Sequence, residues 1–186
     1  MNKIIIVFLL LACTIGQGLN AENLTQRKAI PDVVQYVLNC FAEEQESKEL
    51  VLVEKISGYD EGQISKLGFL FDLYKPLTMG EARGLAIGLT NNLLEKVNNN
   101  EKLKNYLSNS PFTVNNVVMR IRLRQKDCGF IYPALGNIAY VSVIDGKIIY
   151  DTINSFTYDL DNLRTESFAD AIKIPITSTS NAIFSL

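Results

Sequence analysis

Histidine and tryptophan are absent from the 186 residues of the chain. Without histidine, the usual Ser-His-Asp and Cys-His nucleophilic sites and all histidine-containing zinc sites are excluded. The motifs G-x-S-x-G, S-x-x-K and G-x-x-x-x-G-K-[ST] are also missing, which removes the common signatures of serine hydrolases, penicillin-binding proteins and P-loop nucleotide-binding proteins. The lack of tryptophan removes the commonest aromatic platform for sugar rings. We expect neither a metal nor a cofactor.

Cysteine is scarce as well, and the first of the three cysteines, Cys13, lies in an N-terminal leader. This leader has the three parts of a secretory signal: the basic start MNK, the uncharged apolar run IIIVFLLLACTI and the small, polar end GQGLNA. The apolar run is shorter than the ~20 residues of a membrane-spanning helix. We therefore predict a signal peptide over residues 1–21 and export to the periplasm or the extracellular space.

Cys13 allows a second interpretation of the leader. The sequence LLAC resembles the lipobox of bacterial lipoproteins, in which the cysteine carries the lipid that anchors the protein to the outer membrane. Cleavage there would leave a short leader of twelve residues. Cleavage after LNA gives a better-proportioned signal, whose flaw is Leu19 at a position that usually holds a small residue. We favour simple cleavage before Glu22, with the lipoprotein as the alternative and a lipid anchor as its only membrane contact.

Cys40 and Cys128 are the two cysteines outside the leader. In an exported chain they form a candidate disulfide, because compartments outside the cytoplasm permit oxidation. The other interpretation is two separate buried thiols, since a free cysteine packs as a small apolar residue. The sequence does not show whether the two residues are close together, so both interpretations stay open.

Neither sign of charge is in excess, with 18 Lys and Arg, 20 Asp and Glu and a net charge of -2. This balance gives the whole molecule no attraction for nucleic acid or for an anionic membrane surface, so any charged site has to be local. Hydrophobic residues make up 47% and charged residues 20% of the chain, which is typical of a globular protein. We expect a single domain over residues 22–186.

Hydrophobic periodicity divides the chain into helices and strands. Helical spacing is clearest over residues 78–97, where Thr78 and Glu81 form a T-x-x-E capping box. The other predicted elements are a helix over residues 31–44, strands over 49–56, 65–75 and 117–124, a short helix near 101–108, a hairpin over 137–153 with an Asp145-Gly146 turn, and a short helix over 166–173. The strands cluster instead of alternating with helices. This order predicts an α+β fold, with an antiparallel sheet of about five strands and the long helix packed on one face.

Two glycines, Gly84 and Gly88, lie four residues apart on the long predicted helix, so one side of it has little bulk. Such a side suits the close approach of a partner or close packing within the protein. We interpret it as close packing on the protein's own sheet.

An arginine row is the most distinctive charged pattern. Residues 117–124 alternate strictly, so Arg120, Arg122 and Arg124 share one face of the predicted strand while apolar residues occupy the other. On a half-buried strand this face is usually solvated. As a site, it would bind an anion such as a carboxylate, a phosphate or a lipid head group. Three tyrosines, Tyr132, Tyr140 and Tyr150, border this row if the strand register brings them there.

Carboxylates offer a different kind of chemistry. The candidates are Asp72 in the second predicted strand, Asp145 and Asp151 in the hairpin, and Asp159 and Asp161 in an acidic run. A glycosidase needs two such groups ~5–10 Å apart, and their spacing in the sequence does not determine that distance. The simpler interpretations are a turn residue for Asp145 and solvated loop residues for Asp159 and Asp161.

The stretch EARGLAIGLTNNLLEKVNNNEKLKNYLSNSPFTVNNV, followed by IAYVSVIDGKIIYDT and ESFADAIKI, resembles a group of short exported proteins from intracellular Gram-negative bacteria. The resemblance spans residues 77–174 and consists of a long helix, a YL…PFT..N junction, a strand, a hairpin and a closing helix. No activity is known for the group, so the resemblance implies an exported bacterial origin and no catalytic residue.

These observations favour an exported, non-enzymatic binding protein over a carboxylate-based, glycosidase-like hydrolase. The partner is expected to be an anionic ligand or another envelope protein. Two carboxyl groups converging in a cleft would favour the hydrolase, and a surface with neighbouring arginine and tyrosine side chains would favour binding.

Overall fold

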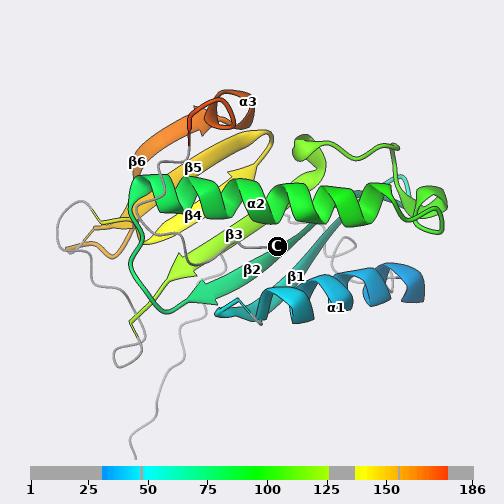
Figure 1. Ribbon diagram of the computed structural model, residues 1–186, viewed down its shortest axis with the longest axis horizontal. Coiled ribbons are helices and arrows are strands. Elements are labelled where there is room, and N and C mark those ends of the chain that lie inside the picture. The colour runs from blue at the N-terminus through cyan, green and yellow to red at the C-terminus, as the bar shows by residue number, and fades with distance from the viewer. Residues whose placement is uncertain (1–30, 47, 126–136, 155, 176–186) are drawn as a thin grey trace, which may run out of the picture.

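The computed structural model describes residues 31–46, 48–125, 137–154 and 156–175. They form one sheet with helices on one face, as Figure 1 shows. The elements are α1 (Asp32–Glu46), β1 (Leu50–Asp60), β2 (Gln63–Leu73), α2 (Met79–Asn98), β3 (Val117–Leu123), β4 (Tyr140–Ile144), β5 (Lys147–Ile153), β6 (Leu160–Ser167) and α3 (Phe168–Ala171), with short 3₁₀ turns η2 (Lys104–Tyr106) and η3 (Val114–Asn116). The predicted α+β class is confirmed.

The sheet has six strands in the order in which they occur along the chain. All neighbouring pairs are antiparallel except β2 and β3, which are parallel. The expectation of an antiparallel sheet of about five strands therefore differs from the structure in two respects. A parallel pair needs a long crossover, and α2 supplies it by returning the chain to the end of the sheet where β2 began. The sixth strand, β6, forms from a polar segment that carries no strand pattern.

The long helix begins as predicted. The hydroxyl of Thr78 accepts a hydrogen bond from the amide of Glu81, and the carboxylate of Glu81 accepts one from the amide of Thr78, at 3.3 and 2.8 Å. This reciprocal pair satisfies two amides that have no partner inside the helix.

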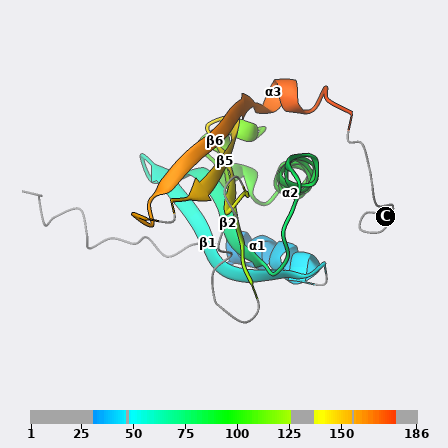
Figure 2. The same cartoon turned by 90° about the vertical axis from the view of Figure 1, so that its left-hand side faces the viewer.

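Both long helices cover the same face of the sheet, which is visible end-on in Figure 2. In α1, Phe41 stacks on Phe69 of β2 with ring centroids 4.8 Å apart, and Phe69 stacks on Phe71 at 5.4 Å. The alternation predicted for β3 is confirmed, because Val117, Met119, Ile121 and Leu123 are all buried in the core beneath these helices. The long helix therefore shares its face of the sheet with α1.

Three glycines differ in whether the structure requires glycine at their position. At Gly68 a Cβ would lie 1.7 Å from the carbonyl oxygen of Val118, so only glycine allows β2 and β3 to pair here. Gly146 has a φ of 71° and follows Asp145 with a φ of 48°, which confirms the predicted tight turn between β4 and β5. Gly88, in contrast, is exposed, and a Cβ there would meet nothing within 4 Å.

The interpretation of Gly88 as a packing residue is therefore wrong. A glycine inside a helix costs about 1 kcal/mol relative to alanine, and no contact among the described residues requires one at this position. Gly84 is half-buried on the same helix.

The described helices include none long and apolar enough to cross a membrane. The predicted signal peptide, Cys13, Cys128 and Tyr132 lie outside the described residues. The export, lipidation and Cys40–Cys128 disulfide interpretations accordingly stay predictions.

Candidate functional site

The arginine row lies on the face of the sheet opposite α1 and α2, which we call the open face. The parallel register places Asp72 of β2 beside Arg122 of β3, and the antiparallel register places Tyr140 of β4 on the other side of Arg122. Arg120 and Arg124 flank Arg122 on the same face, as the alternation predicts. The open face thus brings together the three predicted arginines, one predicted carboxylate and one predicted tyrosine.

Asp72 binds two of the three arginines. Its Oδ1 accepts a hydrogen bond from Nε of Arg122 at 2.6 Å, and its Oδ2 accepts one from Nη2 of Arg122 at 3.0 Å and one from Nη1 of Arg124 at 2.9 Å. The side chain of Asp72 is only 4% exposed, whereas those of Arg122 and Arg124 are 27% and 25% exposed. Hydrogen bonding to this carboxylate raises the pKa of Arg122 above its ordinary value, so Arg122 stays charged over the whole physiological range.

Arg120 differs from its two neighbours. It is exposed, and the residues beside it in the register are Leu70 of β2 and Ser142 of β4, neither of which carries a charge. It forms no ion pair with any residue that the structure describes. Arg120 therefore presents a positive charge on the open face next to the bound pair.

Tyr140 and Tyr150 lie on opposite faces of the sheet. Tyr140 is half-buried beside Arg122 on the open face. Tyr150 points the other way, is fully buried under the helices and donates a hydrogen bond from its hydroxyl to Oε1 of Glu166 at 2.6 Å. The expected combination of arginine and tyrosine on one surface is thus present, with Tyr140 as its described member.

Two of the candidate carboxylates, Asp72 and Asp151, do not converge. Asp72 and Asp151 share a row across the sheet, but β3 and β4 lie between their strands. At ~4.8 Å per strand the two backbones are ~14 Å apart, which exceeds the separation that a glycosidase uses. Asp145 forms an ion pair with Lys66 and occupies the tight turn, as the simpler interpretation expected.

The acidic run lies at the far end of the β5–β6 hairpin. Asp161 accepts a hydrogen bond from the side chain of Asn154 at 3.0 Å, and Asp159 accepts one from the amide of Asn154 at 2.8 Å through its main-chain oxygen. Asp161 belongs to β6 and is not the loop residue that we expected. Both residues are exposed, and their hydrogen bonds shape the turn.

A second carboxylate cluster was not predicted from the sequence. Glu166 of β6 binds Arg83 of α2 through Nε and Nη2, at 2.7 and 3.2 Å. It also accepts the hydroxyl of Tyr150 and Nη2 of Arg164, the latter at 2.9 Å. Arg83 and Glu166 are 83 positions apart in the chain. The available signal was an arginine next to apolar residues of the long helix, such as Ala82 and Ala86, which are buried with it. This cluster fastens α2 to the last two strands.

Burial and hydrogen bonding act in opposite directions on Glu166. Burial alone would raise the pKa of this carboxyl, but the hydrogen bonds from Arg83 and Tyr150 and the charges of Arg83 and Arg164 outweigh it and hold the pKa below its ordinary value. Burial and the hydrogen bond to Glu166 raise the pKa of the Tyr150 hydroxyl. Glu166 is thus ionised and Tyr150 neutral at physiological pH, and the two groups stabilise each other in those states.

Comparisons with protein-family models, curated proteins and solved structures give no match for the chain. The resemblance to short exported bacterial proteins stays a prediction.

Proposed function

We propose that this protein is an exported, non-enzymatic binding protein whose open face holds an acidic segment of a partner protein. The observation that carries this proposal is Arg120, an exposed cation without an ion pair among the described residues, beside two arginines that share one buried carboxylate. The carboxylate of Asp72 is already paired with Arg122 and Arg124. An anion that approaches the open face therefore meets arginine side chains and no unpaired carboxylate of this cluster. Tyr140 adds a half-buried ring beside it.

The spacing of the row suits an extended acidic segment. Alternate residues of a strand are ~6.8 Å apart, and this spacing applies both to the three arginines and to alternate side chains of an extended peptide. Guanidinium groups bind carboxylates in a planar, two-pronged geometry, which gives each contact a defined direction. The hydrolase alternative receives no support from Asp72, because this carboxylate is bound by arginines and lies far from Asp151.

A peptide titration tests the proposal. A fluorescein-labelled peptide with alternating Glu and Thr is compared with a matched peptide in which Gln replaces Glu, by fluorescence anisotropy. We expect the acidic peptide to bind more tightly than the Gln peptide, and this difference in affinity to shrink at about 0.5 M salt, where the screening length falls below ~5 Å.

The variant Arg120→Ala should weaken binding by about fivefold, the equivalent of ~1 kcal/mol for an exposed ion pair. Lys102→Ala removes an exposed cation from the segment after α2 and is the matched control. Equal affinity for the two peptides, or an equal effect of Arg120→Ala and Lys102→Ala, would reject the proposal.

A further inference from the structure

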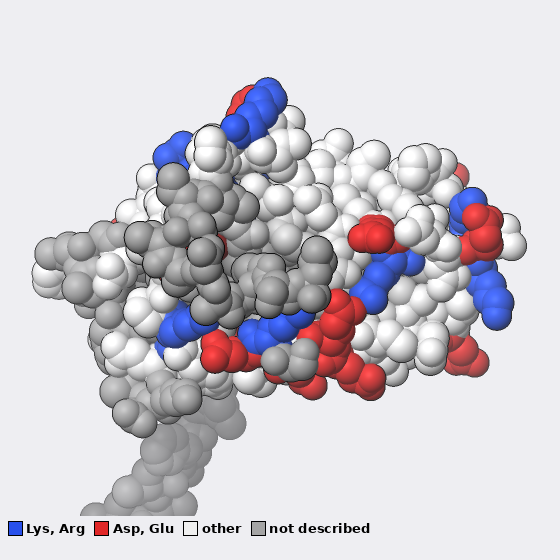
Figure 3. Space-filling model, viewed as in Figure 1, with Lys and Arg blue, Asp and Glu red and all other residues white. Residues whose placement is uncertain are grey.

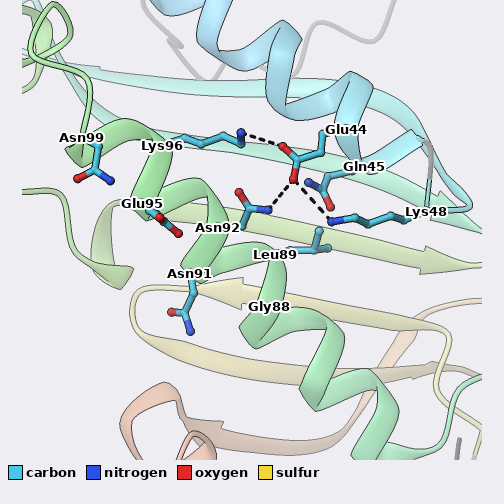
Figure 4. A pocket seen from close by; sticks show the side chains of 10 residues that line it. All are labelled: Glu44, Gln45, Lys48, Gly88, Leu89, Asn91, Asn92, Glu95, Lys96 and Asn99. Carbon is cyan, nitrogen blue, oxygen red and sulfur yellow. Dashed lines mark hydrogen bonds and ion pairs between the residues drawn. The ribbon is translucent and has the colours of Figure 1, made fainter. Parts of the chain in front are cut away.

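A groove of about 620 Å³ lies between the C-terminal end of α1 and the second half of α2, on the side of the sheet opposite the open face. Figure 4 shows its lining side chains, which come from these two helices and from the residues just beyond them. It is thus separate from the arginine row in both position and chemistry.

Gln45 is the feature that points to a ligand. Its residue is 1% exposed, yet its side-chain nitrogen Nε2 has no hydrogen-bond partner. In Figure 4 the side chain extends from α1 toward α2 beside Glu44, along the wall of the groove. A buried amide donor without an acceptor is costly to a folded protein. Because Nε2 is buried, a ligand oxygen reaches it only when the Gln45 side chain turns toward the groove, and this contact would then supply the missing hydrogen bond.

Gly88 keeps the facing wall open. It lines the groove from α2, and the position where its Cβ would stand is empty of other atoms to 4 Å. Its neighbour Leu89 is buried in the core, so the helix is held firmly while this one position carries no side chain. The space between the helices therefore depends on a residue that weakens the helix and that the packing does not require.

The charges of the groove cancel. Glu44 is bound by Lys96 at 2.8 Å, by Lys48 at 3.6 Å and by the amide of Asn92 at 3.1 Å. Figure 3 shows acidic and basic side chains close together over α1 and the second half of α2. With Glu95 as the second acid, two acidic and two basic residues line the groove, together with amide side chains. A neutral polar ligand fits this lining better than an anion does.

We infer that this groove binds an extended, uncharged peptide segment through its main chain, with Gln45 donating to a main-chain carbonyl oxygen. Peptide main chain offers the acceptor that Gln45 lacks and the donors and acceptors that Asn91 and Asn92 can meet. The groove is lined by no aromatic residue within the described part of the chain, and sugar rings generally stack on aromatic rings. A peptide is therefore the better occupant than a saccharide.

The test uses the whole protein, labelled with ¹⁵N, and two probes. The blocked tetrapeptide acetyl-Ala-Ser-Ala-Ala-amide is titrated in one series and maltotetraose in the other, while NMR follows the side-chain amide of Gln45 and the backbone amide of Gly88. We expect saturable shifts of both signals with the peptide and none with the saccharide. Saturation by maltotetraose alone, or no saturable shift with either probe, would overturn the inference.

Two variants of α2 separate filling of the groove from a change in the helix. Gly88→Leu should reduce peptide affinity by roughly tenfold or more, because the side chain occupies the groove. Gly80→Leu is the matched control, since Gly80 also has open space at its Cβ position, lies on the same helix and does not line the groove. Equal affinities of the two variants would contradict the inference.

Gln45→Met tests whether the unmet donor serves binding. Removing this donor should abolish the peptide-induced shift of the Gly88 amide signal. The urea midpoint should stay unchanged or rise, because the free protein loses no hydrogen bond of Nε2. A lower urea midpoint with unchanged peptide affinity would assign Gln45 to structure alone. Arg120→Ala should leave peptide binding in the groove unaffected, so failure of the open-face proposal is distinguishable from failure here.

Discussion

The clusters around Glu166 and Asp72 use the same groups on opposite faces of one sheet. At both, a carboxylate binds two arginines, and the carboxylate side chains are only 8% and 4% exposed. At Glu166 the arginine from α2 is itself only 10% exposed, and Tyr150 contributes a fourth hydrogen bond. At Asp72 both arginines remain about a quarter exposed. The cluster around Glu166, which we call the closed cluster, joins α2 to β5 and β6. The cluster around Asp72 presents its two arginines at the surface.

This difference shows that an ion pair's role depends on where its cation lies. A buried cation needs its carboxylate, because without it an uncompensated charge stays in the core. A cation at the surface can turn to water or to a partner. The following changes test this contrast.

Replacing Glu166 with alanine should have the largest effect. Arg83 would remain buried without its partner, and we expect a loss of about 3–5 kcal/mol in the free energy of unfolding. Urea denaturation followed by circular dichroism measures it. The control is Arg164→Ala, which removes a half-exposed member of the same cluster and should cost less than ~1 kcal/mol.

Replacing Asp72 with alanine should cost less, about 1–3 kcal/mol, because Arg122 and Arg124 already reach solvent and can be hydrated after the change. The same urea titration gives the value. A loss equal to that of Glu166→Ala would show that the open-face arginines depend on their carboxylate as strongly as Arg83 does, and the contrast between the clusters would fail.

Acid should act on the closed cluster in a defined direction. The pKa of Glu166 is lower in the folded protein than its ordinary value of about 4.3 in an unfolded chain. As the pH falls below that value, the unfolded state binds the proton more readily, so the stability contributed by Glu166 is lost as the pH falls through the folded-state pKa. Urea midpoints measured from neutral pH downward should therefore fall less steeply in Glu166→Gln than in the unaltered protein. Parallel curves would contradict this assignment.

The smallest effect on stability is expected at Arg120. Arg120→Ala removes an exposed side chain without an ion pair among the described residues, so the free energy of unfolding should change by less than ~0.5 kcal/mol. Thermal unfolding of the variant measures this. A larger loss would mean that Arg120 supports the fold, and any effect of this variant on peptide binding would then need to be separated from unfolding.

Features that depend on nearby residues were predictable from the sequence. The capping box of α2 involves Thr78 and Glu81, the turn involves Asp145 and Gly146, and the face of Arg122 follows from alternation along one strand. Each signal lies within a few residues, where backbone geometry alone decides the outcome.

Features that depend on register were not predictable. Asp72 meets Arg122 only because β2 and β3 are parallel and paired at that position, which a tertiary crossover decides. Glu166 meets Arg83 because α2 packs across the sheet next to β6, which neighbouring residues in the sequence do not determine either. Strand β6 gave no alternating pattern because residues 160–165 are exposed on both faces, so neither face needs apolar side chains.

The parallel pairing of β2 with β3 has a kinetic consequence. In the antiparallel pairs the nearest paired residues are at most 18 positions apart, as with Arg122 and Tyr140, whereas Leu67 and Val117 meet across fifty positions of the chain. Closing such a long loop costs entropy before any contact repays it, and distant contacts slow folding. The β1–β2 hairpin and the β3–β6 meander can each form early, and their joining beneath α2 is the step we expect to limit the folding rate. Under mechanical or thermal stress, β2 and β3 should separate first. Each would then expose an unpaired strand edge, which promotes aggregation.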